Sequence, residues 1–169
     1  MLPVIEKQLR IYRQRIEELF SQHPDHHLFG SLPGAGPKIA PRLLAEIGDD
    51  RQRFEGNVQA LQSFGGTAPV TVRSGKKRQV HQRWACDKYL RHAIHLFSEQ
   101  TLSRCLWAEI YYRQHRENGQ SHAGALRRLG HRWLKIIHKM WIDRIPYDAE
   151  IHYKNQLQHG SWIFKQQPS

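Results

Sequence analysis

The stretch that decides the fold is LPGAGPKIAPRLLAEIG, residues 32–48. Residues 32–38 are rich in glycine and proline and predict a tight turn, because glycine adopts a positive φ without a steric penalty. From residue 39 onward, apolar residues recur at helical spacing until Gly48 ends the pattern. Since residues 23–31 also predict a short helix, we expect two helices joined by a glycine hairpin. The apolar positions after the turn are Ile39, Ala40, Leu43, Leu44 and Ile47.

This hairpin resembles a helix-hairpin-helix, a motif that binds DNA through backbone amides. Gly34 and Gly36 would shape the turn, so that unpaired N–H groups point outward at the start of a helix and attract a phosphate without reading the bases. Lys38 would add charge. Pro41 is expected to fall in the first helical turn or else to kink the helix. The alternative is a structural hairpin that touches no DNA.

Charge is distributed unevenly along the chain of 169 residues, whose formal net charge is +11. Residues 1–72 hold eight Lys or Arg and eight Asp or Glu, so residues 73–169 carry the whole excess. A one-sided excess of this kind is typical of nucleic-acid-binding proteins, and we predict double-stranded DNA as the partner. The alternative is a surface that is merely basic and soluble.

The densest positive segment runs from residue 73 to residue 91 and contains one acid, Asp87. Ser74 lies in it beside a glycine. A serine hydroxyl among cations could attack a phosphodiester, because the cations stabilise the extra charge on phosphorus. No general base is apparent nearby, so a solvated basic loop is the better interpretation of the pattern alone. The predicted DNA contacts in this segment are Arg73, Lys76, Lys77, Arg78, Arg83, Lys88 and Arg91.

Residues 3–22 predict an amphipathic helix whose apolar positions alternate between spacings of four and three, as in a coiled coil. Isolated helices of this length are marginal in water, so we expect it to need a partner and to make the chain a homo-oligomer. A surface helix that packs on its own domain is the alternative. The apolar seam consists of Ile5, Leu9, Tyr12, Ile16 and Leu19.

Further helices are predicted over residues 57–64, over 84–117 with a break near Ser103, and over 122–142. Residues 67–83 lack a helical period and are expected to form a loop or irregular strands. The last helix carries a basic stripe, which is either a DNA contact or a solvated face. The stripe consists of Arg128, Arg132, Lys135 and Lys139.

The predicted fold class is therefore all-α, with almost no strand. It combines a helix-hairpin-helix with a helical bundle, preceded by a short coiled-coil helix. We expect four parts: the end of the coiled-coil helix (1–22), the hairpin segment (23–66), a serine-bearing helical region (67–148) and a flexible tail (149–169).

No metal site is expected in this chain. The two cysteines are too far apart for the close spacing of a zinc site. Two pairs of histidines at helical spacing lack carboxylate or cysteine companions, namely His23 with His27 and His92 with His95. Neither a signal peptide nor an apolar run of membrane-spanning length is visible, so a cytoplasmic protein without a membrane partner is predicted.

Taken together, the segments resemble the C-terminal domain of the DEDD-type, bridge-RNA-guided insertion-sequence transposases, the IS one-ten group. The resemblance covers residues 3–148, and its specificity lies in the order and spacing of several blocks. These blocks are LPGAGPKIAPRLLAEIGD (32–49), RF (53–54), LQSFGGTAPVTVRSGK (61–76), LRHAIHLFSEQT (90–101), WAEIYYRQHRENGQ (107–120), ALRRLGHRWLKIIHKM (125–140) and PYDA (146–149).

The resemblance implies that Ser74, in the family's Ser-Gly motif, is a catalytic residue that bonds covalently to a DNA phosphate during strand exchange. It also implies an upstream RuvC-like domain, in which four acids hold magnesium, and a structured guide RNA as a further partner. This chain shows no such quartet of acids, and Lys76-Lys77 replaces a serine-rich stretch of some members. We therefore expect the chain to be inactive alone. The alternatives are a non-catalytic helix-hairpin-helix DNA-binding protein, a transposase relic, and a basic RNA-binding accessory protein.

Overall fold

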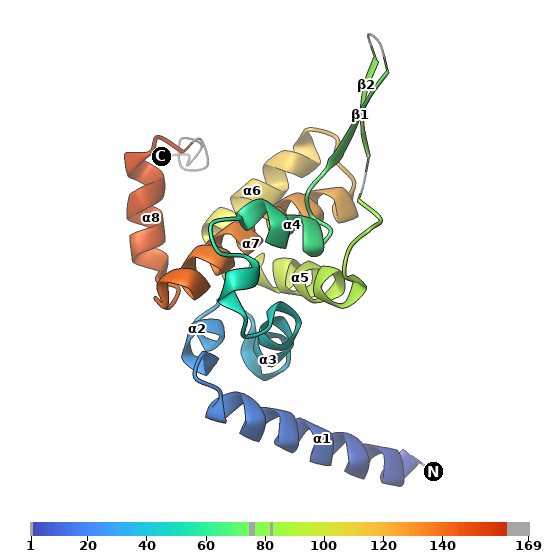
Figure 1. Cartoon of the computed structure of the whole chain (residues 1–169), viewed down its shortest axis with the longest axis vertical. Coiled ribbons are helices and arrows are strands. Elements are labelled where there is room, and N and C mark those ends of the chain that lie inside the picture. The colour runs from blue at the N-terminus through green and yellow to red at the C-terminus, as the bar shows by residue number, and fades with distance from the viewer. Residues whose placement is uncertain (1, 75–76, 82, 162–169) are drawn as a thin grey trace.

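The computed structural model describes residues 2–74, 77–81 and 83–161. Over these residues the chain is mainly helical, which confirms the predicted fold class (Figure 1). The elements in chain order are α1 (Leu2–Gln22), α2 (His26–Gly30), α3 (Gly36–Ile47), the short 3-10 helix η1 (Arg51–Arg53), α4 (Val58–Phe64), β1 (Val70–Ser74), β2 (Lys77–His81), α5 (Lys88–Thr101), α6 (Leu106–Glu117), α7 (His122–Asp143) and α8 (Ala149–Gln158).

Helix α7 is the central element of the helical body and packs against α4, α5 and α6. The indole of Trp133 on α7 lies against the rings of Phe97 and Trp107, with centroid separations of 5.0 and 4.7 Å. Its Nε1–H donates to Thr101 Oγ1 at 3.1 Å. Because Trp133 is fully buried and satisfied, it fixes how α5, α6 and α7 meet.

The glycine hairpin joins α2 to α3, as the sequence predicts. Gly34 and Gly36 have φ values of +76° and +55°, which favour glycine. A Cβ at Gly34 would lie 3.1 Å from the carbonyl oxygen of Gln100, so the turn packs closely on the end of α5. Pro41 lies inside α3 rather than in its first turn. The Pro37 carbonyl thereby loses its helical donor, but Pro37 is exposed and water can satisfy it.

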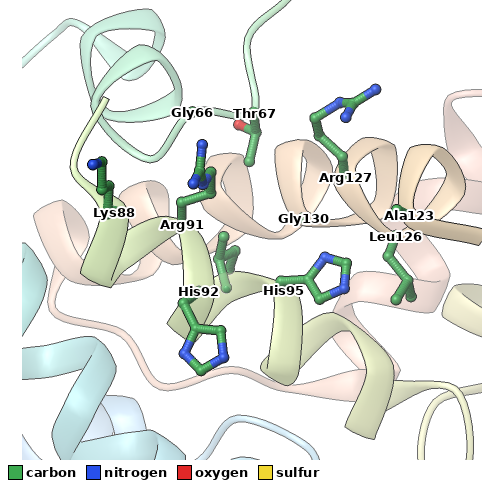
Figure 2. A pocket seen from close by; sticks show the side chains of 11 residues that line it. Gly66, Thr67, Lys88, Arg91, His92, His95, Ala123, Leu126, Arg127 and Gly130 are labelled. Carbon is green, nitrogen blue, oxygen red and sulfur yellow. The ribbon is translucent and has the colours of Figure 1, made fainter. Parts of the chain in front are cut away.

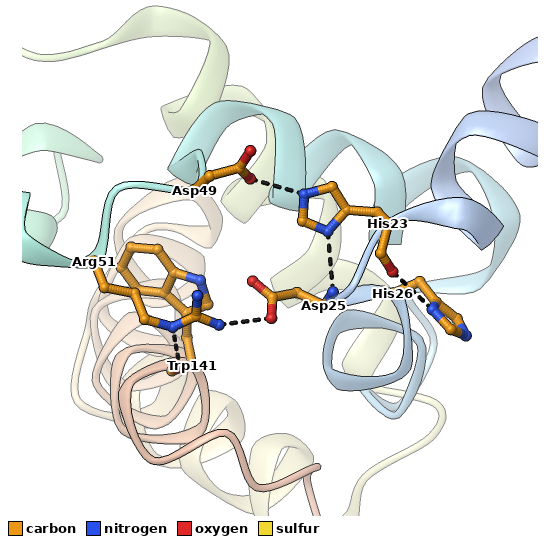
Figure 3. A network of polar contacts seen from close by, with 6 residues as sticks. All are labelled: His23, Asp25, His26, Asp49, Arg51 and Trp141. Carbon is orange, nitrogen blue, oxygen red and sulfur yellow. Dashed lines mark hydrogen bonds and ion pairs between the residues drawn. The ribbon is translucent and has the colours of Figure 1, made fainter.

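A polar network ties the end of α1 to η1 and α7 (Figure 3). The buried carboxylate of Asp25 accepts a hydrogen bond from Arg51 Nη2 at 2.6 Å, and Arg51 Nε donates to the Trp141 carbonyl at 2.9 Å. His23 Nδ1 accepts from the Asp25 N–H at 3.0 Å, so its Nε2–H donates to Asp49 Oδ1 at 2.8 Å. The network pairs buried polar groups and so fixes where α1 leaves the body.

Within residues 67–83, where a loop or irregular strands were expected, residues 70–81 contain a two-stranded antiparallel sheet. Its register pairs Val70 with His81 and Ser74 with Lys77. Valines and a threonine alternate through β1, and such β-branched residues favour extended backbone. The strand is difficult to predict from the sequence because this β-branched run is short. Figure 1 shows the hairpin projecting beyond the helices.

Part of the segment expected to be a flexible tail is helical, since Ala149–Gln158 form α8. Asp148 begins the helix by accepting hydrogen bonds from the N–H groups of Glu150 and Ile151. The His152 ring lies 5.1 Å from that of Trp107, measured between centroids. Arg132, expected on a solvated stripe, donates instead to Gln156 Oε1 at 2.8 Å and is half-buried. Residues 162–169 lie outside the described residues.

Helix α1 extends away from the body, with its main contacts on α2 and α3 (Figure 1). All five residues of the predicted coiled-coil seam are exposed, between 47% and 65%. Phe20, at the last turn of α1, packs against the core. Among the described residues, no helix is both long and apolar enough to cross a membrane.

Candidate nucleic-acid interface

A basic cavity of about 280 Å³ lies between α5, α7 and the segment that leads into the β hairpin. Figure 2 shows Lys88 and Arg91 on α5 and Arg127 on α7 pointing toward the side where Gly66 and Thr67 lie. The lining residues are Gly66, Thr67, Lys88, Arg91, His92, Ile94, His95, Ala123, Leu126, Arg127 and Gly130. We call this hollow the basic cavity.

The start of α5 places its cations in the basic cavity. Asp87 caps this helix by accepting a hydrogen bond from the Leu90 N–H at 2.7 Å. Positions three and four apart then share one face, which brings Lys88, Arg91, His92 and His95 together. On α7, Ser121 caps the helix through the Gly124 N–H. That cap positions the turn that carries Arg127.

Gly66, which lines the basic cavity, lies too close to Cys86 to carry a side chain. This residue has a φ of +66°, and a Cβ there would lie 2.7 Å from Cys86 Sγ and 3.1 Å from Arg91 Cδ. The Asp87 N–H also donates to the Phe64 carbonyl at 2.8 Å. Thus the two ends of the segment that carries the hairpin are held beside each other at the cavity.

The electrostatics of the basic cavity favour an anion. No carboxylate of the described residues lies within ion-pair distance of Lys88, Arg91 or Arg127. Burial lowers the pKa of Arg127, and neighbouring Arg128 adds to that effect. Burial likewise lowers the pKa of His95. The charge of Glu99 opposes this shift, and the nearby His122, His92 and Arg127 reinforce it. A phosphate placed here would relieve cation repulsion and supply missing hydrogen-bond acceptors.

Ser74 lies near the outer end of the hairpin, where its backbone pairs with Lys77. Arg73 and Arg78 are also register partners, so the strands carry three predicted DNA contacts beside the serine. Lys76 lies outside the described residues. The hairpin is therefore an arm, and the basic cavity lies at its base.

The other predicted contacts occupy different places. Gly34 packs near the C-terminal end of α5, and Gly36 and Lys38 follow it at the start of α3, whereas Lys88 begins α5. From Lys88 to Gln100 the helix rises roughly 18 Å. The structure thus separates the hairpin glycines from the basic cavity. Arg83 is half-buried in the link between β2 and α5, and its Nε is buried without a hydrogen-bond partner among the described residues.

Sequence reasoning missed several basic residues at these places. Arg104 Cγ lies 3.4 Å from the Cβ position of Gly34, which adds a cation beside the glycine hairpin. His92 and His95 were considered only as metal ligands, although they share the helical face of Lys88. Arg127 comes from α7, and no local pattern could join it to α5. No group of three or more His, Cys, Asp or Glu among the described residues is arranged to hold a metal.

The fold and its cavity define a helical protein whose cavity holds cations with no carboxylate partner among the described residues, beside a projecting arm. The chain belongs to the Transposase IS116/IS110/IS902 family, which matches residues 26–113. It is 38% identical over 143 residues to the mini-circle putative transposase for IS117 of Streptomyces coelicolor, covering 85% of this chain and 34% of that protein. It is 27% identical over 151 residues to the insertion element IS110 uncharacterized 43.6 kDa protein of the same organism, covering 89% of this chain and 37% of that protein.

A third relative is the insertion element IS116 uncharacterized 44.8 kDa protein of Streptomyces clavuligerus, 25% identical over 146 residues, 85% of this chain and 36% of that protein. The chain therefore spans about a third of the length of the curated relatives it matches. Membership of this family supports a transposase-related role.

Proposed function

We propose that this chain is the DNA-binding, serine-bearing part of an insertion-sequence transposase and that Ser74 is its nucleophile. The observation that carries the proposal is the position of Ser74 near the outer end of an arm whose base adjoins the basic cavity. An arm of this kind can carry a hydroxyl to a DNA strand while the body holds the flanking backbone. Family membership supports the reaction class, and the Ser-Gly resemblance assigns the residue.

The chemistry is a transesterification. The Ser74 Oγ attacks a phosphodiester phosphorus, a P–O bond to the serine forms, and the P–O bond to one DNA oxygen breaks. The leaving oxygen takes a proton, and the covalent adduct keeps the energy of the broken ester for a later joining step. Arg73, Lys77 and Arg78, which belong to the same arm, are the cations that we propose to stabilise the charge on phosphorus.

In the part of the chain that the structure describes, no group of three or more His, Cys, Asp or Glu could hold a metal ion. We propose that magnesium, which would help to activate the hydroxyl, is held by a RuvC-like domain in another part of the protein or in another subunit. A structured guide RNA and self-association through α1 complete the proposed assembly, which acts on DNA in the cytoplasm.

A second candidate is a non-catalytic DNA-binding protein that uses the glycine hairpin alone. The exposure of Gly36 favours it, because a Cβ at this residue would meet nothing within 4 Å. A DNA backbone could therefore approach the start of α3 directly. In this function Ser74 would have no chemical role, and the two candidates differ in whether a covalent adduct forms.

The test is to combine the chain with its cognate RuvC-like half, guide RNA and a cleavable DNA substrate. Mass spectrometry should find DNA attached to Ser74. Ser74→Ala should abolish strand transfer while DNA binding stays nearly intact. Ser103→Ala, which removes another exposed serine hydroxyl, is the matched control and should react normally. An adduct on another residue, or full recombination by Ser74→Ala, would remove Ser74 from the mechanism.

A further inference from the structure

Two exposed aromatic side chains lie close in sequence to residues of the basic cavity. Trp84 and Tyr89, at 76% and 68%, are the most exposed large apolar side chains among the described residues. An indole exposed to this extent offers a flat apolar face on which a ligand can stack. Neither residue belongs to the core, and the serine chemistry does not use them.

Both residues are close in the chain to residues that line or adjoin the basic cavity. Trp84 stands two residues before Cys86, whose sulfur contacts the cavity wall at Gly66. Tyr89 follows Lys88 at the start of α5, about 100° further around the helix. Trp84 precedes Lys88 and Tyr89 follows it, so exposed aromatic rings alternate in the chain with cations of the basic cavity.

We infer that this place binds an unpaired DNA strand, with a backbone phosphate in the basic cavity and bases stacked on Trp84 and Tyr89. Alternating aromatic and basic groups suit single strands, because an unpaired base exposes a face for stacking and its phosphate needs a cation. A base within a duplex is already stacked on its neighbours. The inference rests on the proposed function, in which strand exchange opens the duplex near Ser74.

DNA is favoured over RNA because the aromatic segment continues directly from the arm that carries Ser74, the residue proposed to bond to DNA. A strand held at the base of the arm would extend toward its outer end. The basic cavity offers a site for a phosphate. The proposed binding does not require any contact to a ribose hydroxyl. RNA is therefore an outcome that the experiment must distinguish.

The test measures affinities of the full chain for a short oligothymidylate, the matching oligouridylate and a duplex of the same length. Trp84→Ala should weaken oligothymidylate binding roughly five- to 150-fold, as expected for one stacked base. Its duplex affinity should stay close to that of the original chain, and Trp84→Phe should retain most single-strand affinity. Tyr153→Ala, which removes an exposed aromatic ring on α8, is the control and should bind normally.

The cavity is tested through its charge. Arg127→Gln should reduce the slope of log affinity against log salt by about 0.7 for the oligothymidylate, the value expected for one lost phosphate contact. Arg128→Gln removes a neighbouring exposed cation and should change the slope less. Circular dichroism would establish that each variant remains folded.

Unchanged oligothymidylate binding by Trp84→Ala would overturn the inference, as would an equal loss for the duplex. Tighter binding of oligouridylate would also overturn it and assign the place to RNA. If these losses appear as expected but no Ser74 adduct forms, the single-strand site stands and the catalytic proposal fails. If a Ser74 adduct forms but Trp84→Ala binds oligothymidylate unchanged, the catalytic proposal stands and the single-strand site fails.

Discussion

At the start of α3, Gly36 combines a φ of +55° with open space where a Cβ would lie. The first hydrogen bond into this helix runs from the Ile39 N–H to the Ala35 carbonyl at 3.0 Å. The amides of Gly36 and Lys38 precede that bond and lie at the positive end of the helix dipole. A phosphate could reach them because nothing covers Gly36.

Gly36→Val should therefore weaken binding to every DNA duplex alike, by about tenfold, as expected for a lost charge-assisted hydrogen bond. The branched side chain would block the phosphate and strain a backbone with positive φ. Gel-shift titration with duplexes of different sequence measures the loss. Gly56→Val is the matched control, since Gly56 has a φ of +66° and open space but lies outside the hairpin. A loss confined to one sequence would mean that the hairpin reads bases.

Helix α1 is the element whose packing the chain does not complete by itself. Its seam residues remain about half exposed, although their spacing matches a coiled coil. A hollow bounded by Ile16, Leu19, Phe20 and Pro41 lies where α1 meets α3. A second copy of α1 would bury the seam, which is why we propose self-association.

Ile16→Glu should shift the chain toward monomer in analytical ultracentrifugation, because it places a charge in the seam. Gln14→Glu adds the same charge on the opposite side of α1 and should leave association unchanged. A chain that is monomeric at every concentration, or equal effects of the two substitutions, would exclude a coiled coil at this seam. The helical body, and hence its circular dichroism, should remain intact in both variants.

Across the whole molecule, the sequence predicts the helices and their buried faces well, because periodicity is a local signal. The apolar face of α7 and the break between α5 and α6 agree with it. Helix α8, which Asp148 caps, was not predicted. The ring contact between its His152 and Trp107 joins residues that are far apart in the sequence. Of the cations that line the basic cavity, the sequence predicted Lys88 and Arg91 as DNA contacts because they lie in one basic segment, but Arg127 joins them only through packing.

Histidines placed at several packed positions should make the stability of the whole chain depend on pH. Burial lowers the pKa of His152 to about 4 from 6.5, and nearby Arg132 adds to the effect. Burial also lowers the pKa of His115 and His131. Between about pH 4 and pH 6.5 the unfolded chain binds more protons than the folded chain, so the free energy of unfolding rises with pH. The contribution of these histidines to stability is therefore full above about pH 6.5 and is lost as the pH falls toward 4.

Helix α8 should account for part of this loss, because His152 lies against Trp107 and Tyr147 near the half-buried Arg132. The difference between its two pKa values limits the contribution to about 3 kcal/mol, and partial exposure of the ring reduces it further. Urea unfolding at a series of pH values should give a shallower decline for His152→Gln, since glutamine binds no proton. His159→Gln, at the exposed end of α8, should keep the original decline. Equal slopes for His152→Gln and the original chain would show that protonation of His152 does not limit stability in acid.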